Sequence, residues 1–175
     1  MFKPSILAVS LLFTLAACGD DEPMTSEAPG AALKCASSGK NAFATFGVDA
    51  FVAVNKAIFA EVNAELNAKG DSNLGSSFAG VADFPTFEGR LAAFLVYVYG
   101  GPSKITYVDG KMYDGIQDMQ QAHAGLGITS AQYDYFVANI IVPALAKSGV
   151  PMGDISSCFA PIVLDAGVKA SIVGQ

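Results

Sequence analysis

The sequence has one histidine, one arginine, three cysteines and no tryptophan among its 175 residues, and these shortages exclude several classes of protein. A single imidazole cannot build a metal site that needs two or more histidines, nor hold haem between two histidines. Ten basic residues against sixteen acidic ones give a net charge of −6, so the chain lacks the clustered lysine and arginine that bind nucleic acid. A hydrolase that pairs His123 with Asp114 or Asp118 is disfavoured, because the sequence has no Gly-x-Ser-x-Gly nucleophile motif.

Apolar side chains in helical patterns are abundant. Hydrophobic residues make up 52% of the sequence, which suffices for one packed domain. They recur at spacings of three and four over residues 48–68 and 83–98, and again after residues 129 and 151. This periodicity predicts four long helices, each with one buried face, and therefore an all-α fold.

The third and fourth of these helices carry their own boundary residues. Thr129 and Gln132 have the spacing of a capping box at the start of the third helix, and Gly149 ends it. Pro143 and Pro161 fall inside the third and fourth helices. Because proline removes a backbone donor and crowds the preceding turn, we expect kinks at both positions.

Between the second and third long helices lie two short elements. Residues 104–113, with Asp109 and Gly110 at the centre, are typical of a small β-hairpin. We expect this hairpin either to lie at the rim of a binding pocket or to be only a surface decoration. The stretch from Asp118 to His123 then predicts a short helix, which Gly125 and Gly127 end because glycine accepts a left-handed conformation.

The N-terminal residues are typical of an export sequence. A positive start at Lys3 precedes an apolar stretch over residues 6–17 that is too short to span a bilayer. Leu15-Ala16-Ala17-Cys18 resembles a bacterial lipobox, which implies a signal peptide over residues 1–17 and lipidation of Cys18. The alternative is an ordinary export signal that is cut nearby. Lipidation predicts a membrane-anchored protein of the bacterial envelope, and Gly19 after the cysteine favours the outer membrane, facing the periplasm or the exterior.

After the lipidated cysteine we expect residues 18–40 to form a flexible acidic tether and residues 41–175 to form the folded domain. Two cysteines remain, Cys35 and Cys158. In an oxidising compartment such a pair tends to form a disulfide, here closing a loop that the chain-entropy model values at about 4 to 5 kcal/mol. Two unpaired thiols are the alternative.

Five pieces of sequence resemble the group I truncated haemoglobins over residues 43–173: Met119-x-x-x-His123-Ala-Gly-Leu-Gly-Ile128-Thr129, Phe94 followed by Gly100-Gly101-Pro102, Tyr113-Asp-Gly115, Phe78-Ala-Gly80 and Gly149-Val-Pro151. The first resembles that family's proximal-histidine segment and the second the end of its distal helix. The resemblance implies a two-over-two helical sandwich around haem b, with the hairpin as an insertion before the proximal helix.

The resemblance also implies roles for individual residues. His123, as neutral imidazole, would be the axial ligand of iron, with its other nitrogen donating to a backbone carbonyl. Arg90 would lie beside the haem propionates, although an exposed arginine that balances Glu88 is the alternative. The remaining residues expected to line the haem are apolar or aromatic: Phe59, Phe78, Phe87, Leu91, Leu95, Met119, Tyr133, Phe136, Ile140 and Ile162.

The expected distal side departs from the family. Its best-known members hydrogen-bond dioxygen through a tyrosine and a glutamine, and these positions are Phe59 and Leu91 here, with Phe87 nearby. A hydrogen bond to bound dioxygen is worth on the order of 1 to 3 kcal/mol, so its loss predicts faster dioxygen release. A tyrosine among Tyr97, Tyr99, Tyr107 and Tyr113 is the remaining source of a donor.

Three functions follow from these residues. The first is a haem protein that binds dioxygen or another diatomic gas. The second is a haem enzyme of the same fold that handles nitric oxide or peroxide, which the missing distal donors disfavour. The third is a haem-free helical lipoprotein of the cell envelope.

Overall fold

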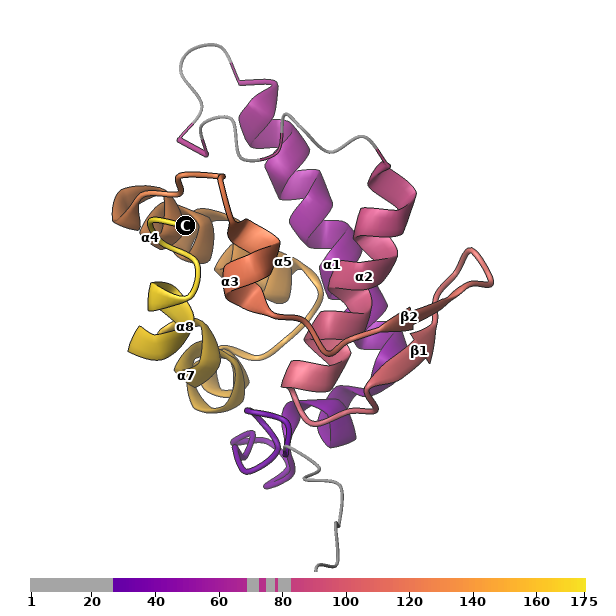
Figure 1. Cartoon of the computed structure of the whole chain (residues 1–175). Helices are drawn as coiled ribbons and strands as arrows, with labels where there is room; N and C mark the ends of the chain where they lie inside the picture. Colours follow the sequence, from indigo (N-terminus) through magenta and orange to yellow (C-terminus); the bar gives the residue numbers. More distant parts are fainter. Residues whose placement is uncertain (1–26, 69–72, 75–77, 79–82) are drawn as a thin grey trace, which may run out of the picture.

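A computed structural model describes residues 27–68, 73–74, 78 and 83–175 of the chain. The expected signal peptide and Cys18 lie outside these residues. Apart from one two-stranded hairpin, the regular elements of the described residues are helices, which confirms the prediction of an all-α protein at that level. Figure 1 shows helix α1 running through the molecule, with helix α2 beside it on one side and the C-terminal helices on the other.

Helix α1 (Ala42–Leu66) begins earlier than expected. The Asn41 side chain caps it by accepting the Ala44 N–H, and Gly47, with φ 74°, kinks it after the first turn. Its buried face carries Phe51, Val54, Asn55, Ile58, Phe59 and Val62. Within the described residues, α1 is the one helix long and apolar enough to cross a membrane, a property that the core helices of many globular proteins share.

Helix α2 (Phe84–Val98) starts and ends where the sequence predicts. Asp83 caps it through the Thr86 N–H, Pro85 occupies the first turn, and the backbone turns away at Gly100, with φ 94°. The helix packs along α1, and three of its five buried positions are small residues: Gly89, Ala92 and Ala93. Small side chains let neighbouring backbones approach closely, and this determines what can pack on that face.

The hairpin consists of β1 (Lys104–Thr106) and β2 (Met112–Asp114), with Gly110 at φ 79° in the turn. It lies across α2 (Figure 1) and buries Ile105, Tyr107 and Tyr113, all of which belong to the main hydrophobic core. A Cβ atom on Gly89 would overlap the Tyr113 ring. The interpretation of this segment as a surface decoration is therefore wrong, because its aromatic side chains complete the core above the small residues of α2.

After the hairpin, the regular elements are short helices. They are α3 (Met119–His123), α4 (Ser130–Phe136), η1 (Val137–Ile141), α5 (Val142–Lys147), α6 (Met152–Asp154), η2 (Ile155–Phe159), α7 (Ala160–Val163) and α8 (Ala166–Ala170). The π-helical segments η1 and η2 end just before Pro143 and Pro161. The expected irregularity at each proline is thus a widened turn, which keeps the chain helical although proline donates no hydrogen bond.

Residues 30–40 are attached to the folded domain by several contacts. Gly30 is buried and donates its N–H to the Val98 carbonyl at 2.7 Å, and Cys35 forms a disulfide with Cys158. Ser37 donates to the buried Asp154 carboxylate from both its N–H (2.8 Å) and its hydroxyl (2.6 Å). The predicted tether over residues 18–40 is wrong for residues 30–40, because these contacts fasten them to the domain.

Candidate functional site

His123 is the last residue of α3, a helix capped at its start by the Asp118 side chain. The imidazole is partly exposed, and its Nδ1 lies 2.7 Å from the Met119 backbone oxygen. A carbonyl oxygen can only accept, so Nδ1 donates this hydrogen bond, and in a neutral ring the lone pair is then on Nε2. The resemblance to the truncated haemoglobins predicts such a contact to a backbone carbonyl. The contact orients the ring and leaves one nitrogen ready to bind a metal.

Within the described residues, no carboxylate forms the hydrogen bond to His123 Nδ1, which the Met119 carbonyl accepts. Asp118 accepts the Gln121 N–H as the α3 cap, and Asp114 accepts the Ile116 N–H. A hydrolytic arrangement would need a carboxylate on the ring nitrogen that the Met119 carbonyl occupies. The geometry therefore favours a ligand role for His123 over a role as general base.

The turn after His123 contains two glycines and is held by backbone hydrogen bonds to the C-terminal residues. Gly125 and Gly127 adopt the positive φ values expected of them, 80° and 61°. The C-terminal residues then pair with this turn, since Gly127 N–H donates to the Gln175 oxygen and Gly174 N–H donates to the Ile128 oxygen, each at 2.9 Å. The periodic pattern of the sequence contains no indication of this contact, because it joins residues far apart in the chain.

The side chains expected to line a cofactor differ in burial. Phe59 and Ile140 are buried, at 5% and 2% exposure, whereas most others are half-buried and lie at the edge of the core. The half-buried members are Phe78, Phe87, Leu91, Leu95, Met119, Phe136 and Ile162. Half-buried aromatic and aliphatic groups of this size are the kind of surface that an apolar ligand covers.

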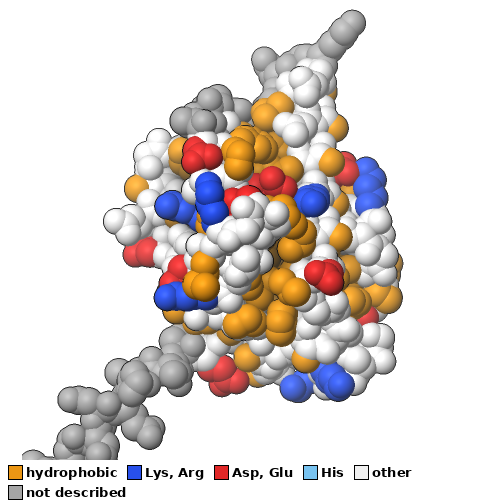
Figure 2. Space-filling view, turned by 90° about the vertical axis from the view of Figure 1, so that its right-hand side faces the viewer, with side chains coloured by type: hydrophobic (Ala, Val, Ile, Leu, Met, Phe, Trp, Pro, Cys, Tyr) orange, Lys and Arg blue, Asp and Glu red, His pale blue; other side chains and the backbone are white. Residues whose placement is uncertain are grey.

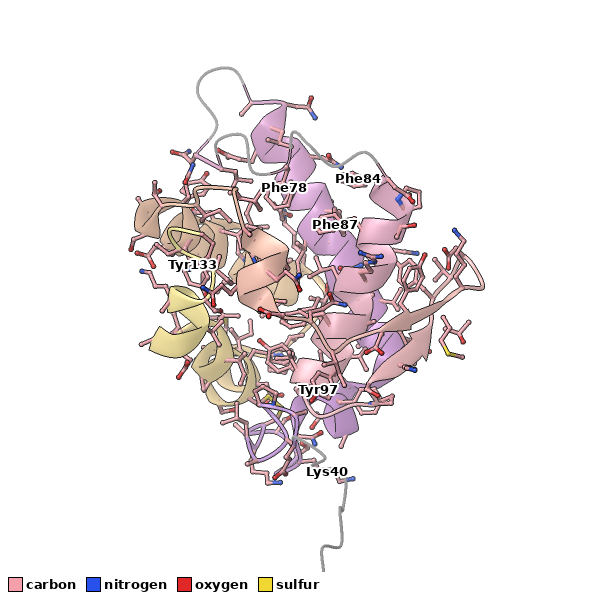
Figure 3. All side chains as sticks on the ribbon, in the orientation of Figure 1. Lys40, Phe78, Phe84, Phe87, Tyr97 and Tyr133 are labelled. Carbon is pink, nitrogen blue, oxygen red and sulfur yellow. A yellow bond between two sulfur atoms is a disulfide. The ribbon has the colours of Figure 1, made fainter. Side chains whose placement is uncertain are left out.

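Four of these side chains form a continuous aromatic cluster. The Phe59 and Phe87 ring centroids are 5.5 Å apart, and Phe78 lies 6.4 Å from Phe87 and 6.0 Å from Phe136. Phe84, which the sequence analysis did not single out, packs edge-on against Phe59 at 4.9 Å. Figure 3 shows Phe78, Phe84 and Phe87 near one another at one end of the molecule. The cluster joins α1, α2 and α4 through Phe59, Phe87 and Phe136.

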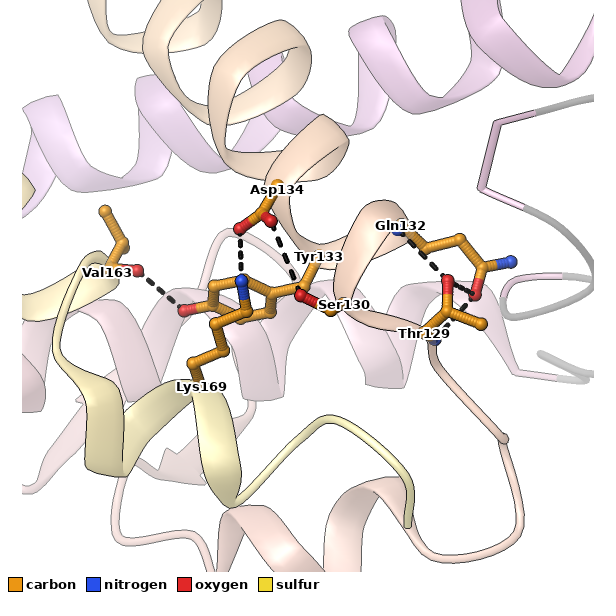
Figure 4. Close-up of polar contacts among 7 residues, drawn as sticks. All are labelled: Thr129, Ser130, Gln132, Tyr133, Asp134, Val163 and Lys169. Carbon is orange, nitrogen blue, oxygen red and sulfur yellow. Dashed lines mark hydrogen bonds and ion pairs between the residues drawn. The ribbon is translucent and has the colours of Figure 1, made fainter.

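Tyr133 has a structural role in the fold. Its hydroxyl donates to the Val163 carbonyl at 2.7 Å, and the Lys169 ammonium lies 5.6 Å from its ring centroid (Figure 4). Lys169 also pairs with Asp134 at 2.6 Å, so this group fastens α8 to α4. In the same view Thr129 and Gln132 form the predicted capping box.

Arg90 is exposed on α2 and forms no ion pair within the described residues. The alternative of an exposed arginine is confirmed, but Glu88 is not its ion-pair partner, because the Glu88 carboxylate accepts the Tyr107 hydroxyl at 2.9 Å. The pKa of Asp83 is lowered, first by its hydrogen bonds with Thr86 and to a smaller extent by the charges of Lys111 and Arg90. The guanidinium is thus available to an acidic ligand group.

Three of the tyrosines considered as distal hydrogen-bond donors donate their hydroxyl hydrogen bonds to other groups of the protein. Tyr99 donates to the Phe159 carbonyl at 3.2 Å, and burial raises its pKa. Tyr113 donates to Asp109 at 2.7 Å. Burial and the hydrogen bond to Glu88 raise the pKa of Tyr107 to about 12. These hydroxyls stabilise the fold and do not supply a polar group to the half-buried apolar side chains.

The described residues contain no group of three or more histidine, cysteine, aspartate or glutamate side chains that could hold a metal ion. A ligand set built from protein side chains alone is therefore absent from this part of the chain, whereas a metal inside a macrocycle needs only one axial residue. No protein-family model and no curated protein matches the chain.

Proposed function

We propose that the protein is a globin of the truncated two-over-two type that binds haem b and, through its iron, dioxygen or another diatomic gas. The observation that carries the proposal is the His123 imidazole, whose Nδ1 is fixed by the Met119 carbonyl while Nε2 has no hydrogen bond to any described residue. An axial ligand needs this arrangement, because the bonded nitrogen sets the tautomer and the ring orientation. When bound, haem supplies the site at which a gas binds reversibly.

The donor set of the chain fits such a group. A porphyrin is a flat apolar disc with two carboxylates at one edge, so it needs apolar walls, one axial base and a cation at the rim. The half-buried side chains Phe78, Phe87, Leu91, Phe136 and Ile162 would provide the walls. Arg90, exposed and without an ion pair in the described residues, would face the carboxylates, since a guanidinium can bind a carboxylate with two hydrogen bonds.

Ligand binding is favoured over turnover by the side chains at the expected distal positions. Phe59, Phe87 and Leu91 cannot donate a hydrogen bond, and the hydroxyls of Tyr99, Tyr107 and Tyr113 have partners within the protein. An enzyme that oxidises nitric oxide needs a long-lived oxygen complex, which a polar donor stabilises. The same apolar side chains suit a small uncharged gas.

The test is an absorbance spectrum of the full chain, purified after expression with added haem, and recorded with and without carbon monoxide. We expect a Soret band that shifts on adding carbon monoxide and is lost in His123→Ala. His123→Gly with added imidazole should recover the band, because the free base replaces the missing ligand. Gln121→Ala, a change on the same short helix, is the matched control and should keep the band. A folded wild-type chain that stays colourless would instead support the haem-free alternative.

We also infer that the protein is anchored in the bacterial envelope through lipid on Cys18. The support is the apolar stretch over residues 6–17 followed by Leu15-Ala16-Ala17-Cys18. More than one acyl chain is needed for stable anchoring. Mass spectrometry of the mature N-terminus should find a lipidated cysteine, and Cys18→Ser should leave the protein unlipidated. An N-terminus cut elsewhere and free of lipid would contradict the anchor.

A further inference from the structure

A groove of about 400 Å³ lies between α1 and the hairpin, away from His123. Figure 2 shows the molecule from the side of the hairpin, and hydrophobic side chains gather near the middle of the face in view. Helix α1 and the hairpin each form one wall. The lining residues are Val48, Asp49, Val52, Ala53 and Lys56 from α1 and Thr106, Tyr107 and Val108 from the hairpin.

One wall of this groove is the free edge of a β-strand. Tyr107 N–H donates to the Lys111 oxygen and Gly115 N–H donates to the Ser103 oxygen, so the odd-numbered residues of β1 are the ones bonded to β2. In an antiparallel pair the residues between them direct their N–H and C=O groups outward. Thr106 is such a residue, and no backbone hydrogen bond within the described residues reaches it from outside the hairpin.

The strand edge is held in place before anything binds. Ile105 and Tyr107, at 7% and 5% exposure, bury their side chains against α2, and the Tyr107 hydroxyl is fixed by Glu88. Lys104 and Thr106, in contrast, are exposed. A fixed strand loses little conformational freedom when a second strand pairs with it, which favours binding.

The opposite wall is apolar with one charge of each sign. Val48 is 38% exposed, and Val52 and Ala53 continue the apolar surface. Neither Asp49 nor Lys56 forms an ion pair within the described residues. Seven residues along a helix span about 10 Å. An extended strand covers that length in about three residues, so a peptide of five residues is long enough to reach both charges.

We propose that this groove binds an extended peptide segment of another protein, which adds to β1 as a third strand and places opposite charges beside Asp49 and Lys56. Strand addition of this kind combines main-chain hydrogen bonds with side-chain pockets on alternate residues. A groove of about 400 Å³ is near the lower end of the volumes of ligand sites, roughly 300 to 1,000 Å³. The free edge of β1 and the unpaired charges of Asp49 and Lys56 match the backbone and the charged side chains of one short strand.

The test is a titration of the full chain, labelled with nitrogen-15, with the peptide acetyl-Lys-Val-Thr-Val-Glu-amide and with the reversed peptide acetyl-Glu-Val-Thr-Val-Lys-amide. We expect one of them to shift the Thr106 amide resonance and to slow its exchange with solvent. Thr106→Pro removes an outward backbone donor and should weaken binding about fivefold, the effect of one hydrogen bond. Met112→Pro is the matched control, because it removes the equivalent donor from the outer edge of β2 and should leave the affinity unchanged.

A second variant keeps the proposal testable if proline disturbs the hairpin. Asp49→Asn with Lys56→Gln leaves the backbone intact and should weaken binding about threefold at low salt, with a smaller loss at high salt. Absence of any shift at Thr106 with both peptides would overturn the proposal, as would an equal loss in Met112→Pro. A Thr106 amide that is already protected in a concentration-dependent dimer would assign the groove to a second copy and also overturn it.

Discussion

The two faces of α2 differ in the size of their side chains and in how completely they are covered. One face carries the small residues Gly89, Ala92 and Ala93, and both alanines have 0% exposure. On this face Gly89 lies against Tyr113 and Ala93 lies against Gly115. On the other face Phe87, Leu91, Phe94 and Leu95 are large and only half-buried. We call these the closed face and the open face of α2.

The difference in side-chain size between the two faces indicates what can pack on each of them. Small residues on the closed face allow the hairpin backbone to approach, and the aromatic side chains of the hairpin fill the remaining space. The large apolar groups on the open face are only half-buried, and they pack against the edge of the core. A ligand that covers these half-buried apolar side chains would stabilise the folded chain. The gain is about 25 cal/mol for each Å² of apolar surface removed from water.

The largest expected effect separates the two faces directly. Ala93→Asp places a carboxylate at a fully buried position without a partner, which costs several kcal/mol and should prevent folding. Leu91→Asp places the same group on the open face, where water can reach it. We expect circular dichroism to show a folded Leu91→Asp chain with reduced haem uptake and an unfolded Ala93→Asp chain. Equal loss of structure in both would remove the distinction between the faces.

The second effect tests the fastening of the N-terminal segment. Replacing Cys35 and Cys158 with alanine opens a loop with a sequence separation of 123 residues. The free energy of unfolding should fall by about 4 to 5 kcal/mol in urea titrations under non-reducing conditions. Spectra of the haem-loaded variant at low temperature should match the wild type, because the disulfide does not belong to the open face. A changed Soret band in the folded variant would show that the open face depends on this bond.

The third effect tests the close approach at the closed face. Gly89→Ala adds a Cβ atom where the Tyr113 ring lies, and overpacking of this kind costs about 1 to 3 kcal/mol. Gly153→Ala is the matched control, since its added Cβ would meet only the Ala36 side chain at 3.7 Å. Thermal unfolding should show a lower Tm for the first variant and an unchanged or higher Tm for the second. A Gly89→Ala chain as stable as the control would mean that the hairpin can move away freely.

The smallest effect concerns the hydroxyl that joins the hairpin to α2. Tyr107→Phe removes the hydrogen bond to Glu88 and should lower the free energy of unfolding by about 0.5 to 1.5 kcal/mol at neutral pH. The folded state raises the pKa of Tyr107 to about 12. An unfolded tyrosine titrates near pH 10. The stabilisation is therefore complete below about pH 10 and is lost as the pH rises towards 12.

Urea titrations of both proteins at several alkaline pH values measure this loss. The difference between wild type and Tyr107→Phe should shrink as the pH rises, because the variant has no hydroxyl to ionise at that position. A difference that stays constant across this range would mean that the Tyr107 hydroxyl ionises equally in the folded and unfolded chains.

Much of the local structure could be predicted from the sequence. The α2 boundaries, the hairpin, the short α3 helix and the capping box at Thr129 all follow from neighbouring residues, because caps, turns and periodic stripes are local properties. The early start of α1 was missed, since Gly47 at φ 74° looks like a helix boundary although the chain resumes the helix after it. The firmly held residues 30–40 were missed because their polar composition resembles that of a linker.

The candidate site divides in the same way. The sequence alone determined that His123 is the only possible imidazole ligand and that the expected distal positions are apolar, because both depend only on which side chains exist. Only the tertiary structure decided that Glu88 bonds to Tyr107 rather than Arg90, that the hairpin belongs to the core, and that the C-terminal residues hold the turn after His123. Those contacts join residues far apart in the chain, and periodicity or capping rules, which depend on near neighbours, do not specify them.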